Sequence, residues 1–221
     1  MKIDWWIGKK RFCSFMVGVF FISLGIAFMV NATLGVAPWD VFHLGVERHL
    51  PLSLGQVMQL TGVLLIIISY YLGVKPNLGT ILNMLLIGIF YDLMVFLGFT
   101  YSPSSVGLRL LLLVVGIFLH GMGTAAYISA NWGPGPRDSL MVALNQRFGM
   151  RIGYVRTGIE IGALGIGFAL GGPVGIGTII FSFSIGFVME FGLFLTGRFF
   201  DLSLSIKTAA KPAAKTGNEA C

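Results

Sequence analysis

The sequence predicts an all-α, polytopic transmembrane bundle of about six spans plus two short re-entrant helices, built from two tandem, inverted repeats. Charged residues make up 11% of the 221 residues, against roughly 25% in an average soluble domain. The mean hydropathy is +0.87, and long stretches of the sequence contain no charged residue. Because this small number of charges cannot cover a water-exposed surface, we expect these stretches to lie in lipid.

Six stretches have the length of a membrane span. A helix of about 20 apolar residues crosses the roughly 30 Å hydrocarbon layer of a bilayer. Strands of a β-barrel would alternate apolar and polar residues, whereas runs such as 63–68 and 110–115 are apolar on every side. We therefore expect helical spans at about 12–33, 54–74, 78–98, 110–130, 152–172 and 176–197.

The two ends of the chain differ from the spans. In residues 1–11, Trp5 and Trp6 lie next to basic residues, which is typical of an interfacial, cytoplasmic anchor. The uncharged run that follows is longer than the core of a cleaved signal peptide, so we expect it to stay attached. Residues 203–221 have little to bury and are expected to form a disordered cytoplasmic tail.

The chain contains an internal repeat. A shift of 98 residues aligns 11–97 with 109–195 without a gap and gives 22 identities in 87 positions. This is about three times what two Gly- and Leu-rich sequences share by chance. The sequence therefore predicts two membrane repeats, 12–98 and 110–197.

Each copy holds three long spans and one short segment, 39–50 or 137–148. Twelve helical residues reach only about 18 Å, too short to cross the bilayer. Three crossings per copy give the copies opposite orientations, as in many secondary transporters. Six crossings place thirteen Lys and Arg inside and two outside. Eight crossings give the same split with both termini again cytoplasmic, so only segment length favours six.

The segment after the first span of each copy carries a Gly/Pro motif with an acidic residue. Asn31 to His43, followed by 53–56 and 77–80, resembles the YczE/YyaS/YitT group of bacterial integral membrane proteins, and the similarity covers most of 11–200. The resemblance implies a polytopic protein of the bacterial inner membrane with a transport or accessory role, and it names no substrate. The motif residues in the two copies are Gly35, Pro38 and Asp40, and Gly133, Pro136 and Asp138.

Two interpretations of the motif stay open. Both elements have the residues of well-capped helix starts. Gly/Pro-interrupted elements at matching positions of two repeats also point to a binding site at the membrane midplane. Under the second interpretation the solute contacts would be Trp39, Asp40, Arg137 and Asp138. An aromatic surface opposite a guanidinium suits an anionic or zwitterionic organic solute, although the second copy lacks the Trp.

Other charges lie within the predicted spans. Arg156 and Glu160 share a helix face, and an intramembrane charge is a functional candidate by default. We therefore expect Glu160 to be a carboxylate that couples transport to a proton or a cation. Arg156 could instead extend to the membrane edge and neutralise Glu160. Asp92 and Glu190 occupy equivalent repeat positions and could take protons or cations, or hydrogen-bond across the bundle. His120 has no repeat partner and is interpreted as a packed side chain.

Several function classes find no support. The chain has no metalloprotease, Walker or nucleophile-elbow motif and no metal-spaced Cys/His cluster, so we expect a non-enzymatic protein without cofactor or metal. Scattered basic residues argue against nucleic acid. We expect a small-solute secondary transporter or permease in the lipid bilayer. An accessory or regulatory protein, or a substrate-binding subunit of a larger transporter, is the alternative, and a homodimer or a partner subunit is left open.

Overall fold

The structure is a computed structural model that describes residues 5–99 and 101–200. Within these residues the chain forms helices and no strands, which confirms the all-α prediction. The expected tail at 203–221 lies outside the described residues. The helices are α1 (Trp5–Ala32), α2 (Pro38–Glu47), α3 (Leu54–Tyr71), α4 (Leu78–Phe96), α5 (Val106–Ser129), α6 (Pro136–Phe148), α7 (Ile152–Ala169) and α8 (Ile176–Phe200).

Five helices of the described chain are long and apolar enough to cross a membrane. They are α1, α3, α4, α5 and α8. The expected span at 152–172 corresponds to α7, which is not among the five. Its 18 residues include Arg156 and Glu160 and many glycines, which lower its hydropathy. The membrane bundle is therefore shown, and a sixth crossing remains a prediction.

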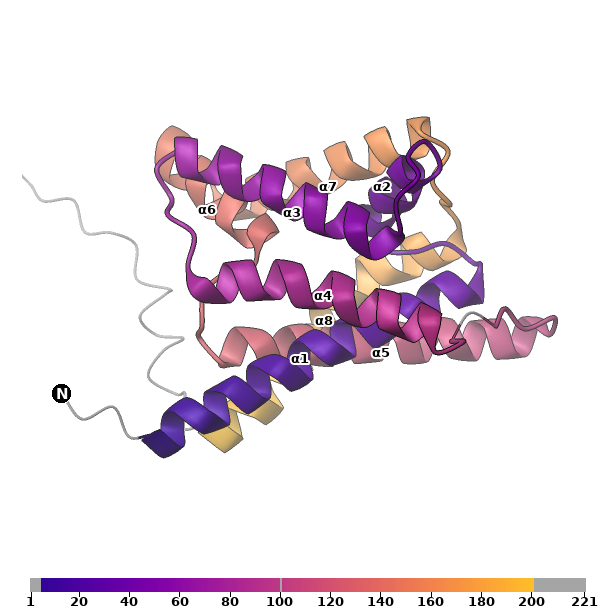
Figure 1. Cartoon of the computed structure of the whole chain (residues 1–221), viewed down its shortest axis with the longest axis horizontal. Helices are drawn as coiled ribbons and strands as arrows, with labels where there is room; N and C mark the ends of the chain where they lie inside the picture. The colour runs from indigo at the N-terminus through magenta and orange to yellow at the C-terminus, as the bar shows by residue number, and fades with distance from the viewer. Residues whose placement is uncertain (1–4, 100, 201–221) are drawn as a thin grey trace, which may run out of the picture.

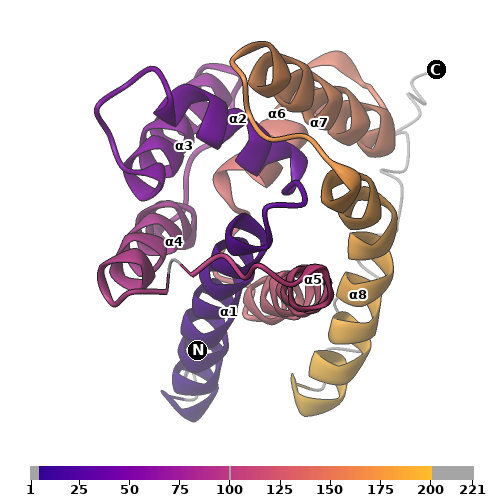
Figure 2. The ribbon, with the colours of Figure 1, turned by 90° about the vertical axis from the view of Figure 1, so that its right-hand side faces the viewer.

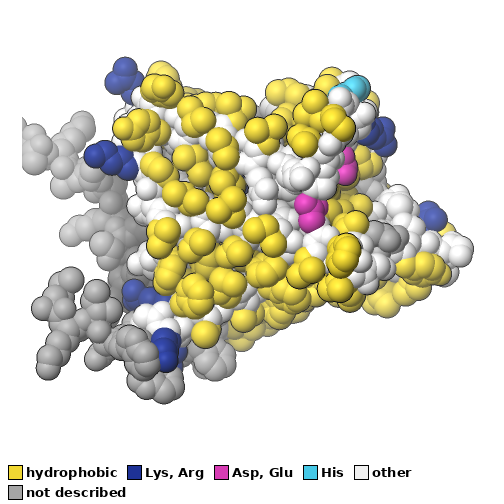
Figure 3. All heavy atoms as spheres, in the orientation of Figure 1, with side chains coloured by type: hydrophobic (Ala, Val, Ile, Leu, Met, Phe, Trp, Pro, Cys, Tyr) yellow, Lys and Arg dark blue, Asp and Glu magenta, His cyan; other side chains and the backbone are white. Residues whose placement is uncertain are grey.

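The long helices run in alternating directions. Figure 1 shows α1, α4 and α7 running one way and α3, α5 and α8 running the other. Basic side chains gather at the two ends of the bundle, with apolar side chains between them (Figure 3). The end where α1, α4 and α7 begin, here called the basic end, carries Lys9, Lys10, Arg11, Lys75, Arg147 and Arg151, and the opposite end carries Arg48 and Arg109.

Close contact between α1 and α5 forms the centre of the bundle (Figure 2). A Cβ atom on Gly18 would lie 2.6 Å from the carbonyl oxygen of Gly123, and one on Gly25 would lie 2.6 Å from that of Gly116. The two helices are thus antiparallel and approach backbone to backbone, as small residues allow in membrane bundles. Outside this pair, α4 packs on α1, α8 on α5, α2 on α7 and α6 on α3.

The two short helices both begin with proline after a glycine of positive φ. Gly35 has φ 101° and Gly133 has φ 133°, a region that other residues rarely adopt. Proline occupies the first turn of α2 and of α6, and neither helix has a side-chain cap. The capped-start interpretation is therefore not supported. With 10 and 13 residues, both helices are too short to cross a bilayer.

Candidate functional site

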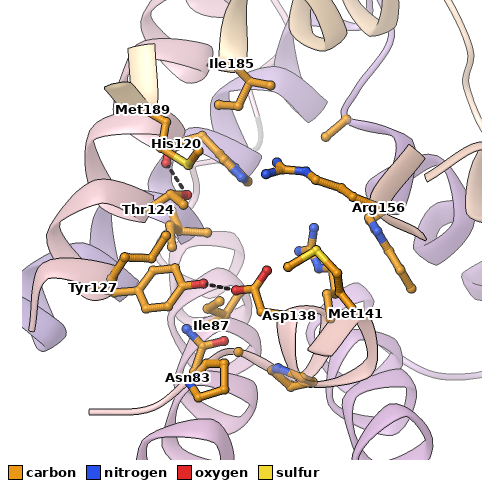
Figure 4. Close-up of a pocket in the computed structure, with 18 of the residues that line it drawn as sticks. Asn83, Ile87, His120, Thr124, Tyr127, Asp138, Met141, Arg156, Ile185 and Met189 are labelled. Carbon is orange, nitrogen blue, oxygen red and sulfur yellow. Dashed lines mark hydrogen bonds between the residues drawn. The ribbon is translucent and has the colours of Figure 1, made fainter. Parts of the chain in front are cut away.

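A cavity of about 830 Å³ lies between the starts of the two short helices. Its wall combines residues 37–39 and 131–138 with side chains of α1, α4, α5, α6, α7 and α8 (Figure 4). Of the residues predicted as site or motif from the sequence, Pro38, Trp39, Gly133, Pro136, Arg137, Asp138, Arg156 and Glu160 line it. The structure therefore brings both Gly/Pro elements and the α7 charge pair to one cavity.

Asp138 is held in place by a tyrosine of α5. The Tyr127 hydroxyl donates a hydrogen bond to Asp138 Oδ2 at 2.5 Å (Figure 4). The preceding loop is anchored to α4, because the Thr80 hydroxyl donates to the Pro134 carbonyl at 2.6 Å. The short helix α6 thus presents its first-turn carboxylate to the cavity in a defined position.

Trp39 and Arg137, which were expected to face each other across a solute, instead contact each other. The Arg137 Cζ atom lies 5.3 Å from the centroid of the Trp39 ring, within the range of a cation–π interaction. Within the described residues Arg137 forms no ion pair. Stacking holds the planar guanidinium in place while its N–H groups remain suited to a carboxylate.

The predicted pairing of Arg156 with Glu160 is present in α7. Arg156 Nε donates to Glu160 Oε1 at 3.2 Å, and the two side chains are 48% and 42% exposed. This pair lies at the cavity wall. A solute entering the cavity would therefore meet two guanidinium groups and two carboxylates.

Four other predicted residues lie elsewhere. Gly35 packs against Gly175. Asp40 does not line the cavity: it is buried behind it, 1% exposed. Asp92 hydrogen-bonds to the start of α3, and Glu190 is exposed on the surface of α8. Asp92 and Glu190 are thus in different environments despite their equivalent repeat positions.

Sequence reasoning missed three polar residues of the wall. Asn83 and Tyr127 were not singled out, and His120 was interpreted only as a packed side chain. His120 does pack edge-to-face on Phe181 at 5.3 Å, but it also lines the cavity and its Nδ1 has no hydrogen-bond partner among the described residues. The signal in the sequence was a polar side chain within an apolar span. Polar residues that only pack between helices give the same signal, so it did not identify the cavity wall.

The bundle of apolar helices defines an integral membrane protein of helical type. Comparison with known families agrees, because residues 9–193 match a family of unknown function, DUF6198. The chain belongs to this family.

Three curated proteins are similar along most of the chain. The uncharacterized membrane protein YczE of Bacillus subtilis is 32% identical over 209 residues, covering 92% of this chain and 95% of YczE. An uncharacterized protein of Haemophilus influenzae is 33% identical over 198 residues, 88% of each chain. YyaS of B. subtilis is 28% identical over 172 residues, 77% of this chain and 86% of YyaS. No solved structure matches the chain.

Proposed function

We propose that the protein is a secondary transporter or permease that moves a small anionic or zwitterionic organic solute by alternating access. The observation that carries this proposal is the cavity of about 830 Å³, which is within the usual size range of small-molecule sites. It is lined by two arginines, two carboxylates and aromatic rings inside a membrane bundle. Arg137 and Arg156 suit a carboxylate of the solute, and Asp138 and Glu160 suit an ammonium group.

A second, much smaller cavity supports alternating access. It measures about 40 Å³ and is lined by, among others, Trp39, His43, Met58, Thr61 and Gly62. Adding the repeat shift of 98 to these numbers gives five residues that line the large cavity, namely Arg137, Met141, Arg156, Ile159 and Glu160. The two cavities therefore occupy equivalent positions of the two repeats, one large and one much smaller.

The two cavities lie next to each other and share part of their walls. The large one is bounded by the end of α5 and the starts of α4, α6 and α7, which lie toward the basic end in Figure 1. The small one is bounded by α2, the middle of α3, the middle of α4 and the start of α6. It shares Trp39, Asn83, Ile87, Pro136 and Arg137 with the large one. Because the copies run antiparallel, exchanging their conformations would close the first cavity and open the second.

Tight backbone contacts close the opposite end. The Gly177 N–H donates to the Leu34 carbonyl at 2.7 Å, and α2 lies so close to α7 that a Cβ atom on Gly167 would clash with the backbone nitrogen of Phe42. These contacts join the first copy to the second across the closed side. Under the positive-inside rule the basic end is cytoplasmic, so this state is open to the cytoplasm, with the start of α1 and the end of α8 on that side of a bacterial inner membrane.

The test is solute binding and transport by the purified full chain. Glutamate, succinate and glycine betaine serve as anionic and zwitterionic probes, with tryptophan fluorescence in nanodiscs reporting binding beside Trp39 and counterflow in proteoliposomes reporting transport. We expect Arg137→Gln to weaken binding at least about tenfold, since a hydrogen bond to a charged group contributes about 1.5–3 kcal/mol. Lys75→Gln, in the exposed α3–α4 linker, is the matched control.

Two results would contradict the proposal. Equal binding and transport by the parent chain and by an Arg137→Gln, Asp138→Asn double variant would exclude the cavity as the site. A folded protein that neither binds nor moves any solute, and that co-purifies with an ATPase or an enzyme, would favour the accessory or subunit role.

A further inference from the structure

The buried carboxylate of α2 has an unusual environment. Asp40 is 1% exposed, and neither of its oxygens has a hydrogen-bond partner among the described residues. It lies in the first turn of α2, next to Trp39, which forms part of the cavity wall. Burying an ionised carboxylate without a partner is costly, so such a group takes up a proton or acquires a cationic neighbour.

His43, one turn further along α2, lies next to Asp40. Its Nδ1 lies 3.6 Å from Asp40 Oδ1, its side chain is 5% exposed, and this Nδ1 also lacks a hydrogen-bond partner among the described residues. His43 lines the small cavity. Burial lowers the pKa of the His43 imidazole, and the adjacent Asp40 opposes this effect.

The surroundings of the pair contain few other ionisable groups. Tyr91 of α4 and His120 of α5 interact electrostatically with Asp40, and Arg137 of α6 interacts with His43. Glu47, at the end of α2, and Asp92 of α4 lie further along the same side and act on Tyr91. Neither α3 nor the part of α7 beyond Glu160, which packs on α2, contains a charged residue.

We propose that Asp40 and His43 form a site for one proton, and that this proton is transported together with the solute. The second half rests on the proposed function. With one proton the pair is neutral overall, as a carboxylic acid beside imidazole or a carboxylate beside imidazolium. With none, a bare carboxylate is buried, and with two, an unpaired imidazolium is buried. Both of these states are costly, so the pair retains one proton while it is shielded from water. It exchanges that proton through the small cavity in one state of the transporter, and past Trp39 and Arg137 through the large cavity in the other.

Trp39 and Arg137 link this site to the solute cavity. The Trp39 ring centroid lies 6.1 Å from that of His43, and the Arg137 guanidinium stacks on the same indole. The positive charge of Arg137 disfavours a proton on His43. A solute carboxylate bound to Arg137 would offset that charge and strengthen proton binding, and by linkage the proton would strengthen solute binding equally. The solute and the proton would therefore cross the membrane in the same direction.

The second copy has no such site. Asp138 corresponds to Asp40, but Met141 stands where the first copy has His43, and Asp138 accepts its hydrogen bond from Tyr127. The asymmetry predicts one transported proton per chain. It also assigns the coupling role to Asp40 and His43 instead of the exposed Glu160 that the sequence favoured.

Infrared spectra of the full-length protein in nanodiscs test the proton site without any solute. Between about pH 5 and about pH 9, we expect a titrating carboxyl signal that Asp40→Asn removes and Asp138→Asn retains. Spectra of ¹⁵N-histidine-labelled protein, assigned with His43→Gln, should show that His43 titrates together with Asp40.

Asp40 and His43 titrating independently, or a carboxyl signal unchanged by Asp40→Asn, would overturn the proton site. A pH-sensitive dye trapped in proteoliposomes then tests coupling with whichever of the three probes binds. Coupled titration without movement of any probe would leave the proton site standing and contradict the transporter. Probe transport at the same rate in Asp40→Asn, without proton movement, would leave the transporter standing and contradict the coupling.

Discussion

Asp92 satisfies the donors at the start of α3. Ser53 Oγ donates to its Oδ2 at 2.5 Å and the Gly55 N–H donates to its Oδ1 at 3.1 Å. Ser53 and Gln56 form a capping box at the same helix start, which satisfies further free N–H groups. The carboxylate therefore joins α4 to α3 and stabilises the fold, whereas Glu190, its counterpart in the second repeat, is exposed on α8.

This difference predicts unequal effects of removing the two charges. Asp92→Asn should lower the free energy of unfolding by about 1–3 kcal/mol, because hydrogen bonds to a charged acceptor are weakened and a donor loses its partner. Glu190→Gln is the matched control and should change little. Thermal unfolding in detergent, followed by tryptophan fluorescence, measures both. Equal loss of Tm in the two variants would contradict a structural role specific to Asp92.

At the scale of the elements, the α1–α5 contact holds the two repeats together. Its glycines are matched in pairs, since Gly18 lies against Gly123 and Gly25 against Gly116. In contrast, Gly158 and Gly162 of α7 have nothing within 4 Å of an added Cβ atom. Glycines with the same appearance in the sequence therefore have different consequences in the fold.

Alanine substitution should separate these two kinds of glycine. Gly18→Ala places a methyl group against the Gly123 backbone and should destabilise the protein by about 1–3 kcal/mol, the usual cost of overpacking. Gly158→Ala should be neutral or stabilising by up to about 1 kcal/mol, since alanine is the better helix former. Unfolding midpoints in the same detergent compare the two. A Tm for Gly18→Ala at or above that of the parent would argue against close α1–α5 packing.

At the scale of the whole molecule, the direction of the helices predicts which loops share a side of the membrane. Ser104, in the exposed α4–α5 linker, lies at the opposite end of the bundle, and Lys75, in the α3–α4 linker, lies at the basic end. After replacement of Cys13 and Cys221, a membrane-impermeant thiol reagent should label Ser104→Cys in intact spheroplasts and Lys75→Cys only after lysis. Labelling of Lys75→Cys before lysis would reverse the proposed orientation. Labelling of both positions from one side would contradict the alternating helix directions.

Much of the site could be predicted because charge is rare in this chain. Arg137, Asp138, Arg156 and Glu160 were found as ionisable residues among apolar spans, and Trp39 was found through the repeated motif. Tyr127 was missed because a tyrosine in a span is compatible with ordinary packing. Asp40 was placed among the solute contacts because its sequence environment is the same as that of Asp138. In the folded protein their environments differ, because Asp138 accepts a hydrogen bond from Tyr127 at the cavity wall, whereas Asp40 is buried without such a partner among the described residues.

The sequence by itself determined the membrane class, five of the helical spans and the two short helices between them, because hydropathy and length depend on local composition. It also identified a 98-residue repeat as a pattern of identities. Only the tertiary structure decided which repeat-equivalent residues face a cavity and which are buried, and which of the two cavities is the larger. Equivalent residues take different environments when two copies pack asymmetrically, and that asymmetry arises from contacts between distant segments, which no local pattern records.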